Sequence, residues 1–218
     1  GDLISIDGEA EYITLRGLSL MYGQADGVGA YRVKNITIEG CTIAHLSKRA
    51  VTLDGAVGCV VRDCHIYDTI DGSIYLWDGG LRGKLVPSGN VIENNDLHDC
   101  NRLKKWTSGS AWCESTGVVI RHNEIHDEAG VALCLSGSND ALVEYNEFYR
   151  TGLSMSDTGA IYYGNDPTVL GITIRHNFFH DLGNTYGGVG QQAILCDDGA
   201  MMPYIYGNLF VNASDDDP

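Results

Sequence analysis

A six-residue phrase recurs eight times along the chain and constrains the fold more than any other feature. Within each copy apolar and polar residues alternate with a period of two, the pattern of a β-strand with one buried face. Successive copies begin 23, 23, 31, 28, 23, 31 and 31 residues apart, and no amphipathic helix separates them. The copies are 13–18, 36–41, 59–64, 90–95, 118–123, 141–146, 172–177 and 203–208. This spacing predicts a solenoid in which every coil adds one rung to the same sheets.

The rows formed by stacking the copies agree with that prediction. The third position is always apolar, and a second apolar row lies five residues further on. The sixth position reads Leu18, Cys41, Cys64, Asn95, Asn123, Asn146, Asn177 and Asn208. Stacked asparagines at a spacing of about 4.8 Å form an amide ladder, which only coils in register can supply. The sequence therefore predicts an all-β protein, a parallel β-helix of about eight coils with an internal Asn ladder.

The fourth, outward position alternates in charge over seven rungs. Its members are Arg16, Glu39, Arg62, Glu93, Arg121, Glu144 and Arg175. Like charges directly opposite each other destabilise a sheet, so alternation favours this register. A merely solvated face would explain polarity but not the alternation of sign.

A second family of strands is predicted elsewhere on each coil, with an unusual outward row. The strands are 49–54, 72–77, 130–135, 159–164 and 192–197. The outward row is Thr52, Tyr75, Leu133, Tyr162 and Leu195, and the inner rows include Ala132 and Cys134. Apolar and aromatic residues facing outward suit a floor on which sugars stack, unless loops cover them. Insertions at 78–89, 101–117, 149–158, 165–170 and 182–191 are expected to wall a groove over this face.

Composition excludes several classes of partner. The chain of 218 residues carries 14 Lys and Arg against 29 Asp and Glu, a formal charge of -15. Such an acidic surface repels phosphate backbones and anionic lipid, so we expect neither nucleic acid nor membrane as a partner. No apolar run approaches the roughly 20 residues of a bilayer span, and the first residues do not resemble a signal peptide. Seven unevenly spaced cysteines predict buried free thiols rather than disulfides or a zinc site, and no cofactor is expected.

Acidic residues cluster where the second strand family meets the insertions. Asp157 precedes one strand, Asp197 and Asp198 end the equivalent strand one coil later, and Asn165 and Asp166 follow the earlier strand. Two carboxylates beside an aromatic floor suit glycoside hydrolysis, in which one acts as acid and the other as base or nucleophile. Asp-Asp-Gly is also a common turn sequence, so spacing alone leaves both interpretations open.

Three segments resemble right-handed parallel β-helix carbohydrate-active enzymes of the pectate-lyase-like superfold, above all glycoside hydrolase family 141. They are 157–166, 174–181 and 194–200. The resemblance implies α-L-fucosidase or xylanase-like activity on an oligo- or polysaccharide, and a secreted or periplasmic location. It makes Asp157 and Asp198 the catalytic carboxylates, with Asp197 the less favoured alternative to Asp198.

Residues expected to contact the sugar are Tyr75, Trp77, Tyr162, Asn165 and Asp166. The chain departs from the family pattern at Asn165, where Arg is common, and at Met201–Pro203. Family members are also much longer. We therefore interpret residues 1–218 as one β-helix domain that is a piece of a larger protein, because 4–6 already reads as strand and a solenoid needs caps.

A histidine row and two other functions complete the alternatives. His98, His126 and His180 share a row with Tyr67 and Tyr149, and an Asp follows each His. The row could hold a cation beside Asp68, Asp99 and Asp127, but such residues more often form hydrogen bonds with turn backbone, and no metal is predicted.

A polysaccharide lyase is a less favoured function because none of the five Lys lies near Asp197. A non-catalytic glycan-binding solenoid is the third hypothesis.

Overall fold

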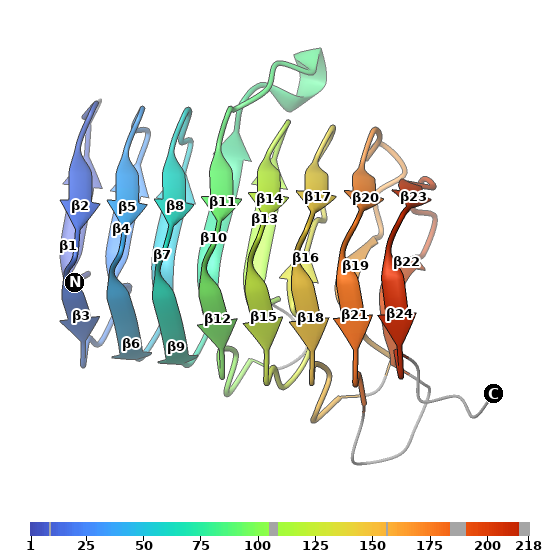
Figure 1. Ribbon diagram of the computed structural model, residues 1–218. Helices are drawn as coiled ribbons and strands as arrows, with labels where there is room; N and C mark the ends of the chain where they lie inside the picture. The colour runs from blue at the N-terminus through green and yellow to red at the C-terminus, as the bar shows by residue number, and fades with distance from the viewer. Residues whose placement is uncertain (9, 105–108, 156, 184–190, 214–218) are drawn as a thin grey trace.

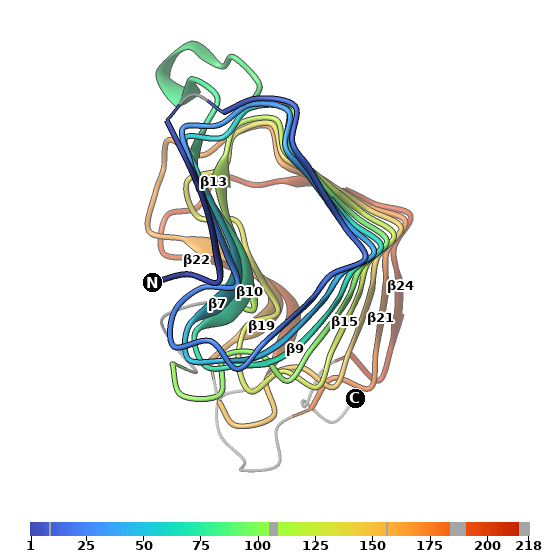
Figure 2. The same cartoon turned by 90° about the vertical axis from the view of Figure 1, so that its left-hand side faces the viewer.

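The chain folds as a parallel β-helix of eight coils, each contributing one strand to each of three sheets (Figure 1). The computed structural model describes residues 1–8, 10–104, 109–155, 157–183 and 191–213. Viewed along the stacked coils, the three sheets form walls around a common interior (Figure 2). The predicted fold class is confirmed.

The first sheet carries the longest and the shortest strands. Its members are β1 (Ile4–Asp7), β4 (Val28–Tyr31), β7 (Arg49–Asp54), β10 (Gly72–Gly79), β13 (Ala111–Ser115), β16 (Leu133–Cys134), β19 (Gly159–Gly164) and β22 (Gln192–Asp197). A short 3-10 turn, η1 (Arg82–Lys84), projects from the connection after β10.

The second and third sheets contain the repeated phrases and the segments that follow them. The second comprises β2 (Thr14–Arg16), β5 (Thr37–Glu39), β8 (Val60–Arg62), β11 (Val91–Glu93), β14 (Val119–Arg121), β17 (Leu142–Glu144), β20 (Thr173–Arg175) and β23 (Tyr204–Tyr206). The third comprises β3 (Ser19–Met21), β6 (Thr42–Leu46), β9 (His65–Thr69), β12 (Asp96–His98), β15 (Glu124–His126), β18 (Glu147–Tyr149), β21 (Phe178–His180) and β24 (Leu209–Val211).

Both predicted apolar rows form the interior. In the row that begins at Leu15, the residues from Ile38 to Ile174 are at most 1% exposed. The other row ends in a ring stack, in which Phe179 lies 5.0 Å from Phe148 and 5.1 Å from Phe210 between centroids. Burial of these rows on every coil is the main driving force for stacking the rungs.

The predicted asparagine ladder is present at the bend between the second and third sheets. From Asn123 onward, the Oδ1 atom of each Asn accepts from the backbone N–H and the Nδ2 group of the Asn one coil earlier, at 2.9–3.0 Å, and Asn95 Oδ1 accepts from the Cys64 N–H at 3.0 Å. Each Nδ2 group also donates to a backbone carbonyl, as Asn123 does to Ile92 at 3.0 Å. The ladder therefore satisfies polar groups that the bend would otherwise leave buried and unpaired.

The residue before each ladder position makes the bend itself. The fifth position of every phrase has a left-handed backbone, with φ from 53° to 68°. These residues are Gly17, Gly40, Asp63, Asn94, His122, Tyr145, His176 and Gly207. Glycine, asparagine and aspartate tolerate this conformation best, which accounts for five of the eight identities.

The alternating charges of the second sheet pair across rungs as predicted. Glu39 accepts from Arg16 and from Arg62, and Arg121 donates to Glu93 and Arg175 to Glu144, both at 2.8 Å. Hydrogen bonds from Arg62 and Arg16 lower the pKa of the Glu39 carboxyl. The row thus discriminates against a one-rung slip, which would place like charges opposite each other.

The first sheet departs from the sequence prediction in two places. Leu133 pairs with Ile161 and is fully buried, while Cys134 pairs with Tyr162 on the outer face, so the predicted placement of these two residues was wrong by one position. The segment Val131–Leu135 is entirely apolar and β16 is only two residues long. The alternation of polar and apolar residues therefore could not show which of its side chains face outward.

The second departure concerns the predicted insertion 101–117, which contains strand β13 and thus one complete rung of the first sheet. Residues 105–108 of that insertion and 184–190 of the insertion 182–191 lie outside the described residues.

All seven cysteines are free, as expected, and six are buried. Within the described residues no helix is both long and apolar enough to cross a bilayer.

Candidate functional site

The outer face of the first sheet carries a row of large side chains interrupted by small ones. The register pairs Tyr75 with Trp112, Trp112 with Cys134, Cys134 with Tyr162, and Tyr162 with Leu195. The outward residues two places further on are Trp77, Glu114, Ser136, Gly164 and Asp197. Small residues between aromatic and acidic ones leave a depression along the sheet.

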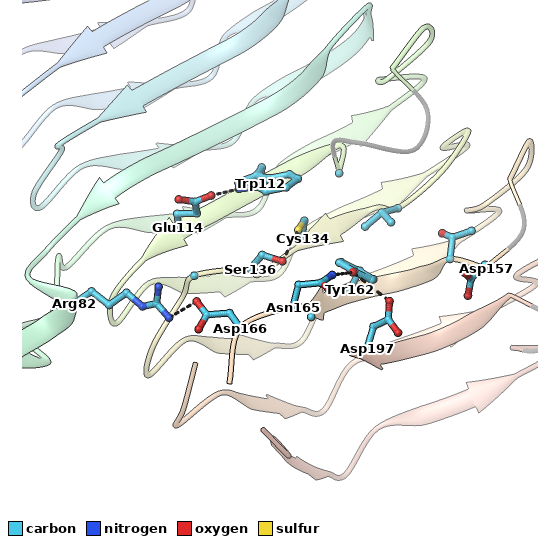
Figure 3. Close-up of a pocket in the computed structure, with 15 residues that line it drawn as sticks. Arg82, Trp112, Glu114, Cys134, Ser136, Asp157, Tyr162, Asn165, Asp166 and Asp197 are labelled. Atoms are coloured by element: carbon cyan, nitrogen blue, oxygen red, sulfur yellow. Dashed lines mark hydrogen bonds and ion pairs between the residues drawn. The ribbon is translucent and has the colours of Figure 1, made fainter. Parts of the chain in front are cut away.

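That depression is a cavity of about 500 Å³ over β13, β16, β19 and β22 (Figure 3). Its volume lies within the usual range for a ligand-binding pocket. It is lined by Arg82, Gly109, Trp112, Glu114, Val131, Cys134, Ser136, Gly137, Asp157, Thr158, Tyr162, Gly164, Asn165, Asp166 and Asp197. Most of these residues come from the rungs with insertions, so the predicted walls do form around a pocket.

Gly164 gives the cavity its depth beside Asp197. A Cβ atom at this position would lie 2.9 Å from both the Cβ and the carbonyl oxygen of Asp197, and 3.0 Å from the Tyr162 hydroxyl. Real Cβ atoms do not approach so closely, so any larger residue would displace the Asp197 carboxylate or the Tyr162 ring. Glycine is therefore required by the close approach of β19 and β22 at the pocket floor.

A short hydrogen-bond chain orients Asp197. The Tyr162 hydroxyl donates to Asp197 Oδ2 at 3.3 Å, and Asn165 Nδ2 donates to the same hydroxyl at 3.2 Å. The backbone N–H of Asp198 donates to the other oxygen, Oδ1, at 3.0 Å. Burial, together with the Asp197 charge, raises the pKa of the Tyr162 phenol, so this hydroxyl stays protonated and remains a donor.

The rim of the pocket is closed by an ion pair between segments 84 residues apart. Arg82, carried by η1, donates from Nη2 to Asp166 Oδ2 at 2.6 Å and to the Thr168 hydroxyl at 2.8 Å. Hydrogen bonds from Thr168, and then from Arg82, lower the pKa of the Asp166 carboxyl to about 2. The Asp166 carboxylate therefore stays ionised and anchors the insertion through its ion pair with Arg82, and it is poorly suited to donate a proton.

An aromatic platform continues the site toward the N-terminal rungs. Trp112 stacks on Trp77 with ring centroids 5.9 Å apart, and its Nε1 group donates to Glu114 at 3.0 Å. Trp77 lines a second cavity of about 450 Å³, which shares Arg82, Glu114 and Gly137 with the first. The two cavities thus form one groove from β7 to β22, five strand spacings or about 24 Å long.

The predicted site residues divide into three groups. Asp157, Asp197, Tyr162, Asn165 and Asp166 all line the larger cavity, and Trp77 lines the adjoining one. Asp198 is exposed in the turn after β22 and lies outside the lining of both cavities.

Tyr75 points outward but is only 2% exposed, because the Arg49 guanidinium covers its ring at 4.2 Å from the centroid. The sequence left open that loops cover this row; the cover over the Tyr75 ring is instead a side chain of the neighbouring strand β7, and Tyr162 lines the cavity.

The large aromatic and charged side chains of the pocket that escaped the sequence prediction are Arg82, Trp112 and Glu114. Trp112 and Glu114 lie in the rung that was interpreted as an insertion, and Arg82 lies in the insertion after β10. The alternation Ala-Trp-Cys-Glu-Ser was a usable signal, since Ala111 and Cys113 are at most 1% exposed while Trp112 and Glu114 face outward. No local signal places Arg82, whose partner Asp166 is distant in sequence.

Comparison with known proteins agrees with the architecture. A family model described as "Right handed beta helix region" matches residues 2–85 and 82–216. The chain belongs to this right-handed β-helix family. The search of curated proteins finds no match.

Several solved structures share the fold. An alginate lyase from Paenibacillus sp. str. FPU-7 is 16% identical with a TM-score of 0.64, the alignment covering 94% of this chain and 87% of that one. XylC in complex with xylose is 15% identical with a TM-score of 0.61, covering 88% and 36%. A protein titled "Glycoside hydrolase" is 14% identical with a TM-score of 0.57, covering 86% and 38%. The chain therefore spans less than two fifths of the length of the last two, and at these identities the likeness shows the fold.

Proposed function

We propose that this protein binds a neutral polysaccharide along the groove of the first sheet and hydrolyses a glycosidic bond within it. The observation that carries the proposal is the cavity of about 500 Å³, in which two aromatic rings, Trp112 and Tyr162, stand beside the carboxylates of Asp157 and Asp197. Aromatic faces stack on sugar rings, and a pair of carboxylates supplies the acid and base of glycoside hydrolysis. Activity of the α-L-fucosidase or xylanase kind, implied by the resemblance to family 141, and a secreted or periplasmic location form part of this proposal.

The geometry supports Asp197, rather than Asp198, as the base or nucleophile. Donors face both Asp197 oxygens, Tyr162 at Oδ2 and the Asp198 N–H at Oδ1, and these hydrogen bonds hold the carboxyl group in one orientation in the pocket. Asp157 lies at the opposite end of β19 and is exposed in the pocket lining, where it can exchange a proton with a leaving group. In Figure 3 Asp197 lies between Asp157 and the Arg82–Asp166 pair.

We infer inversion rather than retention of the anomeric configuration, because Asp157 precedes β19 whereas Asp197 ends the neighbouring β22. Gly159 pairs with Gln192 and Gly164 with Asp197, so five strand steps, about 17 Å of backbone, separate the two ends of the site. Two acids that reach a bound sugar from opposite ends of neighbouring strands suit the wider carboxyl spacing of an inverting pair. Retaining enzymes need carboxyl groups only about 5 Å apart, whereas inverting enzymes use about 6.5–9.5 Å.

The charge of the pocket favours a neutral glycan over a polyuronate. Four carboxylates line it, those of Glu114, Asp157, Asp166 and Asp197, against one guanidinium that is already paired. A uronate polymer would meet like charge along the groove. This balance supports hydrolysis above the lyase hypothesis.

Substitutions at Asp197 and Asp157, with a control at the neighbouring Asp198, test the proposal. Asp197→Asn and Asp157→Asn should each lower kcat/KM on a neutral polysaccharide by roughly 10²–10⁴-fold, the usual contribution of a general acid or base. The matched control Asp198→Asn should stay within about threefold of the unchanged protein, because its side chain lies outside the pocket lining. Reducing-end release from a panel of neutral and uronate polysaccharides measures the rate, and proton NMR of the first product gives its anomeric form.

Four results would contradict the proposal. Undiminished activity of Asp197→Asn would remove the assigned residue, and inactivity of Asp198→Asn alone would restore the family-based assignment. Unsaturated products from a uronate polymer would establish a lyase instead. Tight glycan binding without turnover would leave a binding module.

A further inference from the structure

A compact group of nitrogen and oxygen ligands lies on the outer face of the third sheet, on a different wall of the β-helix from the groove. His65 stands on β9 directly opposite Asp96 on β12, and His98 lies two residues beyond Asp96 on the same strand. Outward positions two residues apart on neighbouring strands are diagonal neighbours, which long side chains can bridge. Stacking of two coils thus brings the His65 imidazole to the Asp96 carboxylate and the His98 imidazole, which follow it by 31 and 33 residues in the chain.

The distances among the three side chains match the coordination sphere of a small transition metal. His65 Nε2 lies 2.9 Å from His98 Nε2 and 3.5 Å from Asp96 Oδ2, and one atom of each residue lies within 4.8 Å of the others. Ligands at 2.0–2.1 Å from a tetrahedral ion are separated from one another by about 3.3 Å. Only small side-chain adjustments are needed to enclose an ion, and the exposed side leaves a fourth position to water.

Neighbouring groups hold two of the three ligands, His98 and Asp96, in the orientation that binding requires. Asp99 Oδ2 lies 2.8 Å from His98 Nδ1, a contact that keeps the proton on Nδ1 and presents the lone pair of Nε2. His126 contacts Asp96 Oδ1 through Nε2 at 3.1 Å and Asp127 through Nδ1 at 2.7 Å, which leaves the other Asp96 oxygen for His65 or a metal.

The rings of Tyr67 and His126 also fix the plane of His98. They stack on it with centroids 5.2 Å and 4.9 Å away. The orientations of His98 and Asp96 are therefore set by their neighbours before any ion binds.

We propose that His65, Asp96 and His98 form a binding site for one divalent transition-metal ion of the Zn²⁺ type. Two imidazoles and one carboxylate are borderline ligands that suit Zn²⁺, Co²⁺, Ni²⁺ or Cu²⁺, whereas Ca²⁺ and Mg²⁺ require mostly oxygen. The bound ion joins the third and fourth coils across the outer face. Because it binds the folded chain, where these residues converge, it raises the stability of the fold by mass action.

Calorimetry and a spectroscopic probe test the site on tag-free protein. Titration with Zn²⁺ should give one ion per chain, and Co²⁺ should produce the visible absorption of a low-coordinate N/O site. His65→Ala and His98→Ala should each weaken Zn²⁺ binding at least tenfold, and Asp96→Asn serves as a nearly isosteric second variant. Saturating Zn²⁺ should raise the melting temperature of the unchanged protein but not that of these variants.

His180→Ala is the matched control. His180 has the same type of surroundings, with Asp181 2.8 Å from Nδ1 and Glu147 2.9 Å from Nε2, but no second imidazole belongs to its group among the described residues. Its Zn²⁺ affinity should equal that of the unchanged protein. Absence of Zn²⁺ binding at micromolar concentrations, or undiminished binding after both His65→Ala and Asp96→Asn, overturns the proposal and leaves a direct hydrogen bond between the two imidazoles.

Discussion

The second and third sheets differ from the first sheet in how closely their rungs repeat. Strands of the second sheet are all three residues long and pair in unbroken register, and most strands of the third do the same. The first sheet has strands of two to eight residues and a register shift between Leu76 and Gly79. The regular walls bury the apolar rows, and the irregular wall contains the cavity. In this protein repetition stabilises the fold, and departures from repetition build the site.

The largest effect is expected from breaking the regular wall. Asn123→Ala removes the acceptor for the Asn95 backbone and side-chain N–H groups, and the donor to two buried carbonyls. Each buried polar group left unpaired costs about 1–3 kcal/mol, so the free energy of unfolding should fall by roughly 3–5 kcal/mol. Urea denaturation followed by circular dichroism measures it.

The control for this variant is the adjacent His122→Asn. His122 is exposed, and asparagine tolerates its left-handed backbone, so the change in unfolding free energy should stay below about 0.5 kcal/mol. Equal effects from the two variants would mean that the ladder contributes nothing special to the regular wall.

A substitution in the irregular wall should harm the site while sparing the fold. Gly164→Ala forces a Cβ atom against Asp197 and the Tyr162 hydroxyl. We expect kcat/KM on the polysaccharide to fall about 10–100-fold, since misplacement of a catalytic group by about 1 Å is enough for such a loss. Glycan affinity should weaken in parallel.

Gly40→Asn is its counterpart on the regular side. Nothing lies within 4 Å of a Cβ atom built there, and asparagine accepts the local φ of 59°. Activity should be unchanged. A similar loss in both glycine variants would show that activity depends on the helix as a whole and not on the pocket floor.

A buried acid in the turn after β15, Glu128, should make the free energy of unfolding depend on pH. Glu128 is fully buried, and its Oε2 atom has no hydrogen-bond partner among the described residues. Burial raises the pKa of the Glu128 carboxyl well above its ordinary value near 4.5, and the charges of Asp99 and Asp127 add to the shift. Above pH 4.5 the unfolded chain loses this proton while the folded chain keeps it, so the unfolding free energy falls as pH rises.

Glu128→Gln removes this dependence. Its advantage over the unchanged protein should be near zero at pH 4 and grow by up to about 1.4 kcal/mol for each pH unit above pH 4.5 at which only the folded chain keeps the proton. Thermal melts at a series of pH values test this expectation. A constant difference between the two proteins across the series would contradict it.

The smallest effect is expected in the charged row of the second sheet. Glu93→Gln removes the carboxylate that Arg121 contacts at 2.7 Å and Arg62 at 4.0 Å. Partly exposed pairs contribute about 0.2–1 kcal/mol each and are screened by salt. The loss should therefore shrink when the melting temperature is compared at 0.05 M and 1 M NaCl. A salt-independent loss would point to packing rather than charge.

Much of the candidate site could be anticipated because it inherits the register of the rungs. Asp157, Tyr162, Asn165, Asp166 and Asp197 were predicted to converge, and all five line one cavity. Strand alternation also bears on the choice between Asp197 and Asp198, because Asp197 lies two residues after the outward Leu195 and so shares its face, whereas the family resemblance pointed to Asp198. Trp112 was not predicted because residues 101–117 were interpreted as an insertion, although they contain strand β13.

The sequence by itself determined the β-helix, its interior rows, its asparagine ladder and its alternating charges. Each of these features depends on a residue pattern that repeats once per coil, so that like positions of neighbouring coils pair with each other. Only the tertiary structure decided that Arg82 reaches Asp166, that Arg49 covers Tyr75, and that His65 meets His98. Such contacts join loops or diagonal positions on different coils. Their geometry follows from how the coils stack and how each insertion folds back, which no local pattern of residues encodes.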